Sequence, residues 1–115
     1  MGRTVLIVDD HPSFRGSARR MLEADGYEVV GEAHDGTSAI DAVRELRPDV
    51  VLLDIRLPDI DGFRVAERLS GAARAIVLTS SHDRSDFARE IANSPADGFV
   101  PKSELSAEAI TSLIR

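Results

Sequence analysis

The chain has 115 residues, which is enough for one domain and too few for two of ordinary size. Its formal net charge is −6, so we expect no direct binding to nucleic acid, because phosphate contacts require a basic face. The absence of cysteine excludes disulfides and thiolate metal sites and suits a cytoplasmic location, and no apolar run approaches the ~18 residues of a membrane span.

Two strand patterns alternate with two helix patterns in the first half of the chain. Residues 4–8 are almost all aliphatic or β-branched, which is typical of a strand buried on both faces. Residues 28–33 include Gly31 and predict a weaker strand near an edge of the sheet. The first helix is expected to begin at Pro12, and the second to stop before Pro48. The apolar faces of these helices comprise Phe14, Ala18, Met21, Leu22, Ile40, Val43 and Leu46.

The same alternation continues in the second half. Residues 50–53 and 75–78 predict buried strands, and residues 98–100 predict a short last strand. One helix is expected after the loop at 57–62, a weaker helix follows the fourth strand, and Ser106 caps a final helix. The apolar faces of these three helices comprise Val65, Ala66 and Leu69, then Phe87, Ile91 and Ala92, then Ala109, Ile110, Leu113 and Ile114.

Strands that alternate with helices predict a parallel sheet covered by helices on both faces. Right-handed crossovers leave few arrangements for five such units. We therefore expect an α/β domain over residues 1–115 with a doubly wound, five-stranded parallel sheet in the flavodoxin-like order 2-1-3-4-5.

Three aspartates end the two strands predicted to lie at the centre of this sheet. Asp9 and Asp10 follow the first strand, and Asp54 follows the third. Neighbouring strands lie ~4.8 Å apart, so these carboxylates converge at one edge of the sheet. At such distances each charged pair repels by about 3 kcal/mol, which predicts a compensating cation. Oxygen ligands favour Mg²⁺ over zinc.

A hydroxyl and an ammonium are expected at the same edge. Thr79 follows the fourth strand, and Lys102, the single lysine of the chain, follows the fifth. Carboxylates, a hydroxyl and a lysine together are typical of sites that handle phosphoryl groups, because metal and lysine neutralise phosphoryl oxygens while a carboxylate attacks.

In this order and spacing, the residues at the strand ends resemble those of the CheY-like family of response-regulator receiver domains. The run from Asp9 to Arg15 further resembles the NarL/FixJ-like branch. The motifs that carry the resemblance are Val8-Asp9-Asp10, Leu53-Asp54-Ile55-Arg56-Leu57-Pro58 with Gly62, Leu78-Thr79-Ser80 and Val100-Pro101-Lys102.

The resemblance implies a role for each matched residue. Asp54 would be the phosphoacceptor, and Asp9, Asp10, Asp54 and the backbone carbonyl of Arg56 would bind Mg²⁺. Lys102 would pair with the phosphoryl group.

Two further positions would form the switch. Thr79 would hydrogen-bond the phosphoryl group, with Ser80 as the alternative because Thr79-Ser80-Ser81 leaves the register open by one residue. Phe99 would occupy the aromatic position that turns inward on activation.

The implied function is phosphorylation by a sensor histidine kinase in a two-component system. The partners would be that kinase, a C-terminal DNA-binding output domain outside this chain, and a second copy on phosphorylation, through the fourth strand, fifth strand and fourth helix. No enzymatic activity is expected beyond self-phosphorylation and self-dephosphorylation. One alternative is a degenerate receiver that acts only as a protein-interaction module. Another is a haloacid-dehalogenase-type phosphatase, which requires Asp-x-Asp after the first strand. A third is a flavodoxin-like flavin carrier, which requires a phosphate-binding loop at that position.

Overall fold

Five parallel strands form the central sheet in the order β2-β1-β3-β4-β5, as the sequence predicts. The computed structural model describes residues 2–114, and the predicted domain limits, Met1 and Arg115, lie outside them. The strands are β1 (Thr4–Val8), β2 (Glu28–Ala33), β3 (Val50–Asp54), β4 (Ala75–Ser80) and β5 (Gly98–Pro101). The order reverses between β1 and β3, so the site predicted at their carboxyl ends lies at the switch point of the sheet.

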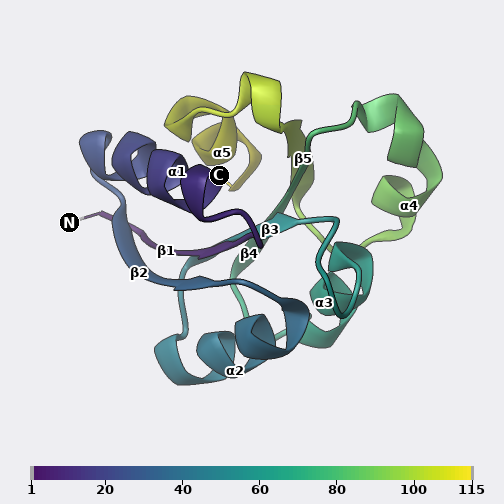
Figure 1. Ribbon diagram of the computed structural model, residues 1–115, viewed down its shortest axis with the longest axis horizontal. Coiled ribbons are helices and arrows are strands. Elements are labelled where there is room, and N and C mark those ends of the chain that lie inside the picture. Colours follow the sequence, from purple (N-terminus) through teal and green to yellow (C-terminus); the bar gives the residue numbers. More distant parts are fainter. Residues whose placement is uncertain (1, 115) are drawn as a thin grey trace.

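Helices cover both faces of the sheet (Figure 1). α1 and α5 lie on one face, α2 and α3 lie on the other, and α4 lies beyond β5. The helices are α1 (Pro12–Ala24), α2 (Gly36–Leu46), α3 (Gly62–Leu69), α4 (Ala88–Asn93) and α5 (Ala107–Ile114), and the 3₁₀ turns are η1 (Arg84–Phe87) and η2 (Lys102–Glu104). Within residues 2–114, no helix has the length and apolar composition needed to cross a bilayer.

Each face of the sheet has its own apolar core, because successive strand residues point to opposite faces. On the α1–α5 side, the core includes Val5, Ile7, Leu52 and Val77 from the strands and Leu22 and Ile110 from the helices. On the α2–α3 side, it includes Leu6, Val51, Leu53, Leu78 and Phe99 from the strands and Val43, Val65 and Leu69 from the helices. The strands that carry the site are therefore held from both sides.

The weaker strand predicted at residues 28–33 is β2, and it lies at an edge of the sheet. Its pairing with β1 shifts by one residue between Val5 and Leu6, and Leu6 then faces Gly31. A Cβ at Gly31 would lie 2.9 Å from Leu46 Cδ1, so a larger residue here would require the Leu46 side chain to shift.

Three sequence predictions about the helices and strands need correction. Leu46 was expected in the core but is 42% exposed, because it occupies the last turn of α2, and Arg47 ends that helix with a left-handed φ of 47°. Ala92 was expected on a buried stripe but is exposed, since α4 contains no buried residue. β4 extends two residues beyond the predicted Leu78 and takes in Thr79 and Ser80.

Candidate functional site

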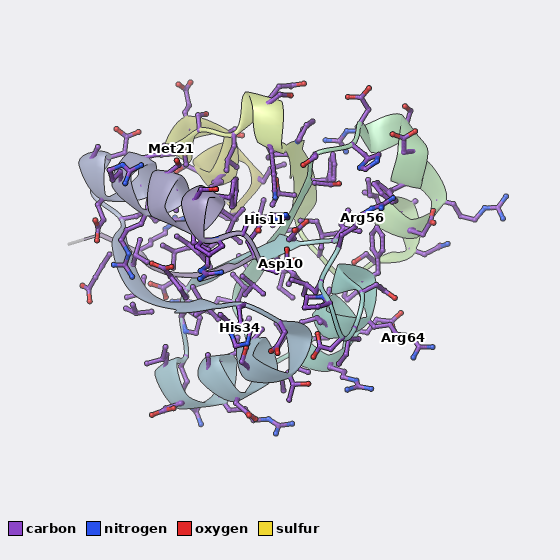
Figure 2. The ribbon with its side chains drawn as sticks, in the orientation of Figure 1. Asp10, His11, Met21, His34, Arg56 and Arg64 are labelled. Atoms are coloured by element: carbon purple, nitrogen blue, oxygen red, sulfur yellow. The ribbon has the colours of Figure 1, made fainter. Side chains whose placement is uncertain are left out.

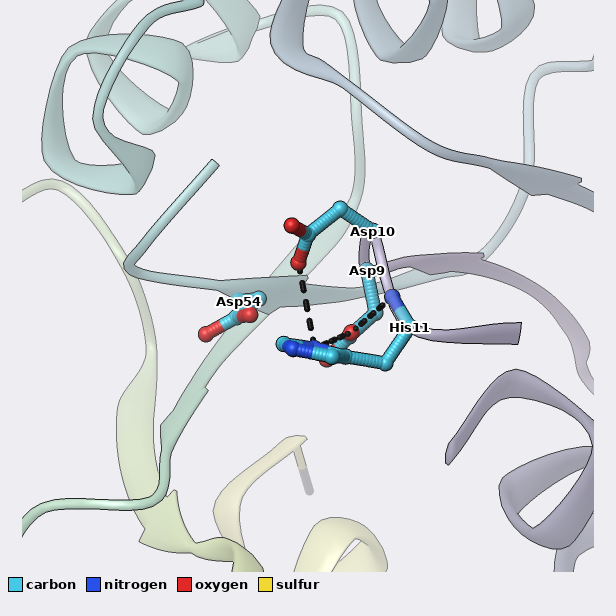
Figure 3. A group of neighbouring side chains, drawn as sticks. All are labelled: Asp9, Asp10, His11 and Asp54. Atoms are coloured by element: carbon cyan, nitrogen blue, oxygen red, sulfur yellow. Dashed lines mark hydrogen bonds and ion pairs between the residues drawn. The ribbon is translucent and has the colours of Figure 1, made fainter. Parts of the chain in front are cut away.

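The side chains at the carboxyl ends of β1 and β3 meet beside the start of α1 (Figure 3). Asp9 directly follows β1, Asp54 is the last residue of β3, and Lys102 directly follows β5. Because every second strand residue points to the same face, Asp9 follows the direction of Ile7, and Asp54 follows that of Leu52. Both acids are thus brought to the same side of the sheet by the alternation that builds the α1–α5 core.

The predicted acids converge in the structure. Asp9 is fully buried, the Asp54 side chain is 4% exposed, and the Asp10 side chain is 37% exposed. One ligand atom from each of Asp9, Asp10, His11 and Asp54 lies within 4.8 Å of the others. The cluster is therefore closed at its inner end and open to solvent at Asp10.

Lys102, which directly follows β5, reaches the same cluster. Its Nζ lies 2.6 Å from Asp9 Oδ2 and 3.6 Å from Asp54 Oδ2. The same ammonium lies 4.2 Å from the centre of the Phe14 ring, in cation–π contact. The predicted approach of the single lysine to the acids is thus present in the folded chain.

Burial and mutual repulsion shift the acids in opposite directions. Burial, followed by repulsion from Asp9, raises the pKa of Asp54 to about 6 against the attraction of Lys102. Burial alone would raise the pKa of Asp9 as well, but Lys102 and the N–H groups of His11 outweigh it and hold the pKa of Asp9 below its usual value. One ammonium therefore compensates Asp9 better than it compensates Asp54.

The chemistry of this cluster fits a divalent cation. The Lys102 ammonium pairs with the buried Asp9 Oδ2 at 2.6 Å and lies farther, at 3.6 Å, from Asp54 Oδ2. Asp54 is left with a raised pKa, which means that its charge lacks sufficient compensation. Mg²⁺ prefers oxygen ligands and is usually bound by one or two carboxylates, with water or phosphate oxygens as its other ligands, so carboxylates placed in this way could bind it.

Arg56 lies in the loop after β3, as the predicted role requires. Its backbone N–H donates to Asp54 Oδ1 at 3.3 Å, and its side chain is exposed. Gly62 closes this loop by donating its N–H to the carbonyl oxygen of Ile55 at 2.7 Å. A Cβ at Gly62 would meet the Asp54 carbonyl and lie 2.7 Å from Ile55 Cα, so only glycine allows this approach. Figure 2 labels Asp10 and His11, which follow β1, and Arg56, which follows β3.

The two candidate hydroxyls differ in their surroundings. Thr79 pairs in register with Asp54, whereas Ser80 is one residue further along β4 and points to the other face. Thr79 Oγ1 donates to the carbonyl oxygen of Val100 at 2.7 Å, and Ser80 Oγ accepts from the backbone N–H of His82 at 3.1 Å. The register favours Thr79, but its hydroxyl is engaged with β5 in this structure.

Phe99 is buried on the α2–α3 side and is covered by an arginine that the sequence did not suggest. Arg84 Nη2 donates to the Phe99 carbonyl oxygen at 2.7 Å. The guanidinium carbon of Arg84 also lies 5.5 Å from the centre of the Phe99 ring. The two residues are 15 positions apart, and no local pattern links them.

His11 is the site residue that sequence reasoning missed. It was expected to be exposed or to cap a helix, and it is indeed the exposed N-cap residue of α1. Its ring, however, lies 2.9 Å from Asp9 Oδ1 and 3.1 Å from Asp10 Oδ1. The one available signal was its position directly after two aspartates and before Pro12, which anchors the start of the helix.

Curated relatives match almost the whole chain. The family profile described as response regulator receiver domain matches residues 5–115. The transcription regulator BvgA of Bordetella pertussis is 42% identical over 113 residues, which are 96% of this chain and 54% of BvgA. The nitrate/nitrite response regulator NarP of Escherichia coli K12 is 40% identical and is matched over 92% of this chain and 52% of NarP. The chain thus spans about half the length of these relatives.

Solved structures support the same relationship. The signal receiver domain of the response regulator NarL from Mycobacterium tuberculosis superposes with a TM-score of 0.86 at 34% identity, covering 96% of this chain and 94% of that one. A two-component response regulator of the LuxR family from Aurantimonas superposes with a TM-score of 0.86 at 35% identity, covering 98% and 83% of the two chains. The chain belongs to the family of response regulator receiver domains, as its strand-end motifs predicted.

Proposed function

We propose that Asp54 accepts a phosphoryl group from a sensor histidine kinase while Mg²⁺ is held by Asp9, Asp10, Asp54 and the backbone carbonyl of Arg56. The observation that carries the proposal is the convergence of three carboxylates within 4.8 Å, with Lys102 Nζ 3.6 Å from Asp54. When bound, Mg²⁺ would neutralise phosphoryl oxygens and reduce the repulsion between the acids.

The proposed step is a transfer between two nucleophiles. An Asp54 carboxylate oxygen forms a bond to phosphorus while the phosphorus–nitrogen bond of a phosphohistidine breaks, and the released imidazole nitrogen takes up a proton. The attacking carboxylate must be ionised, and a pKa of about 6 leaves Asp54 mostly ionised at neutral pH. Lys102 lies close enough to pair with the oxygens of the incoming group.

The proposed switch exchanges one hydrogen bond for another. A phosphoryl group adds about one negative charge and three acceptor oxygens, so the Thr79 hydroxyl would leave Val100 and donate to it. Two charge-assisted hydrogen bonds formed only in this state would supply ~3–6 kcal/mol. That is comparable to the ~5.5 kcal/mol that moves a population from 1:99 to 99:1. Phe99 and the segment that covers it would then repack.

The partners are proposed from the relatives. BvgA and NarP are described as regulators and are about twice as long as the matched region, so we infer a DNA-binding output region linked to a receiver of this kind. A sensor histidine kinase, a homodimer formed on phosphorylation and a cytoplasmic location belong to the same proposal. The only activity proposed for the chain itself is its own phosphorylation and dephosphorylation.

Labelling with acetyl phosphate tests this proposal. The chain should gain one phosphoryl group in the presence of Mg²⁺, lose it on treatment with hydroxylamine, and gain none in EDTA. Asp54→Asn should abolish the labelling, whereas Asp41→Asn, which changes an exposed aspartate on α2, should leave it intact.

Absence of labelling in a folded wild-type chain with Mg²⁺ would favour the degenerate, protein-binding alternative. Release of phosphate over many turnovers would instead indicate a phosphatase.

A further inference from the structure

The His11 imidazole adds a nitrogen atom to a cluster that otherwise offers oxygen. His11 Nδ1 lies 2.9 Å from Asp9 Oδ1 and 3.1 Å from Asp10 Oδ1. Figure 3 shows the ring next to Asp9 and Asp10, in a group that also contains Asp54. All four residues can offer ligand atoms within 4.8 Å of one another, a spacing that a single ion can bridge.

The backbone holds the ring in this position. The His11 N–H donates to Asp9 Oδ1 at 2.8 Å, and the extended His11 backbone (φ −98°, ψ 110°) leads directly into Pro12 and α1. The His11 side chain is 64% exposed, so an ion can reach it from solvent. The fully buried Asp9 supplies the inner end of the cluster, where its Oδ2 lies 2.6 Å from the Lys102 ammonium.

The other two histidines have different environments. His34 Nε2 lies 3.4 Å from one carboxylate oxygen, that of Asp35, at the start of α2. The His82 ring packs edge-on against Phe87, with 6.1 Å between the ring centres. Among residues 2–114, His11 is the histidine found in a group of acids that could hold a metal ion.

We propose that His11 Nδ1 is a ligand of this site and makes it prefer divalent ions that favour imidazole, Zn²⁺ and Co²⁺ in particular, over Mg²⁺. The inference rests on the metal site of the proposed function and extends it to ion selectivity. Mg²⁺ takes oxygen ligands and gains little from an imidazole, whereas zinc and cobalt bind imidazole nitrogen well. To bind an ion, His11 Nδ1 would have to be unprotonated, with the ring proton on Nε2.

A consequence is competition at one site. Zn²⁺ or Co²⁺ would share Asp9, Asp10 and Asp54 with Mg²⁺, so each ion should displace the others. The test is a titration of the metal-free chain with Co²⁺, Zn²⁺ and Mg²⁺, followed by visible absorption of Co²⁺ and by ¹⁵N resonances of the histidine rings.

In the wild-type chain, Zn²⁺ should shift the His11 Nδ1 resonance, and Co²⁺ should show the absorption bands of a nitrogen-containing ligand set. His11→Asn should weaken Zn²⁺ and Co²⁺ binding by at least the ~10-fold that loss of an outer-shell partner costs. The same substitution should change Mg²⁺ affinity by less than ~2-fold, because Mg²⁺ prefers oxygen ligands. His34→Asn is the matched control and should bind all three ions like the wild type.

Equal Zn²⁺ affinity in the wild type and His11→Asn, or a His11 resonance that does not respond to Zn²⁺, would overturn the inference. The resonance is measured in the wild-type chain, so this result does not depend on a variant. Failure of the proposed function is distinguishable, since that failure would be loss of Mg²⁺-dependent labelling of the wild type.

Discussion

The carboxyl ends of β1 and β3 are much more deeply buried than the segment between Arg84 and Asn93. At the strand ends, Asp9 and Asp54 are buried and follow strands that are covered on both faces. The 84–93 segment, which comprises η1 and α4, contains no buried residue. Half-buried Phe87 and Ile91 attach it to the core, together with the Arg84 contact to β5.

This difference separates the site of chemistry from the part that can move at low cost. Local opening requires least free energy where few apolar contacts must be broken. Both the buried Thr79 and the exposed Arg84 donate hydrogen bonds to carbonyl oxygens of β5, from Val100 and Phe99 respectively. β5 therefore connects Thr79, which pairs in register with Asp54, to the loosely packed segment through these two hydrogen bonds.

Shortening one apolar side chain in each region tests the packing contrast. Leu69 on α3 is 1% exposed, so Leu69→Ala should lower the free energy of unfolding by about 2–5 kcal/mol. Ile91→Ala on α4 should cost only about 1 kcal/mol, because the partly buried Ile91 side chain removes less apolar surface from water on folding. Urea unfolding measures both free energies. Similar losses for the two variants would show that the two regions do not differ in packing.

Removing the ammonium tests how the buried acids are balanced. In metal-free protein at pH 7, Lys102→Gln should lower the free energy of unfolding by about 3 kcal/mol, because it leaves the fully buried Asp9 uncompensated. Added Mg²⁺ should restore part of this loss by binding the folded state.

The control for that substitution is Arg74→Gln. Arg74 lies 3.5 Å from Asp49 but is 83% exposed, so its loss should cost less than about 1 kcal/mol. Equal effects of the two substitutions in urea unfolding would show that Lys102 is not needed to balance the buried acids.

The raised pKa of Asp54 predicts a pH dependence of stability in metal-free protein. The folded state binds the proton more tightly than the unfolded state, whose carboxyl has its usual pKa of 3.8. Burial of the ionised carboxylate thus destabilises the fold above pH 6, and the contribution of Asp54 to stability should rise by about 2 kcal/mol as pH falls from 7 to 4, against the opposite contribution of acids with lowered pKa such as Asp9. Asp54→Asn should be more stable than the wild type at pH 7, and this difference in stability should shrink by about 2 kcal/mol between pH 7 and pH 4. Unfolding curves in EDTA at several pH values measure it, and an unchanged slope in the variant would assign the effect to another group.

The smallest expected effect is local. Arg84→Gln removes the donor to Phe99 and should lower the opening free energy of the 84–93 segment by about 1 kcal/mol, with global stability almost unchanged. Amide hydrogen exchange of this segment measures the change, and Arg89→Gln on the exposed side of α4 serves as the control. If both variants exchange alike, the Arg84 contact does not hold the segment.

The fold was predictable because each strand and each helix carries its own periodic signal. The errors lie where that signal ends. Leu46 and Ala92 fit a helical stripe, but a stripe does not show whether the sheet reaches that turn of the helix. The end of β4 was placed two residues early, since the limits of a strand depend on pairing with its neighbours.

The site was partly predictable, because parallel topology alone brings the ends of β1, β3 and β5 to one edge. The convergence of Asp9, Asp54 and Lys102 follows from that rule. The approach of His11 to the acids depends on one side-chain rotamer at a helix start, and the Arg84 contact depends on how a loop folds over β5. Neither leaves a periodic signal in the chain.

Chemical trapping of the phosphorylated residue tests the central claim most directly. Borohydride reduces an aspartyl phosphate to homoserine, and peptide mass spectrometry then locates the modified residue. After incubation with acetyl phosphate and Mg²⁺, the account predicts homoserine at position 54 alone and none in EDTA. Homoserine at Asp9 or Asp10, or at position 54 regardless of Mg²⁺, would contradict it.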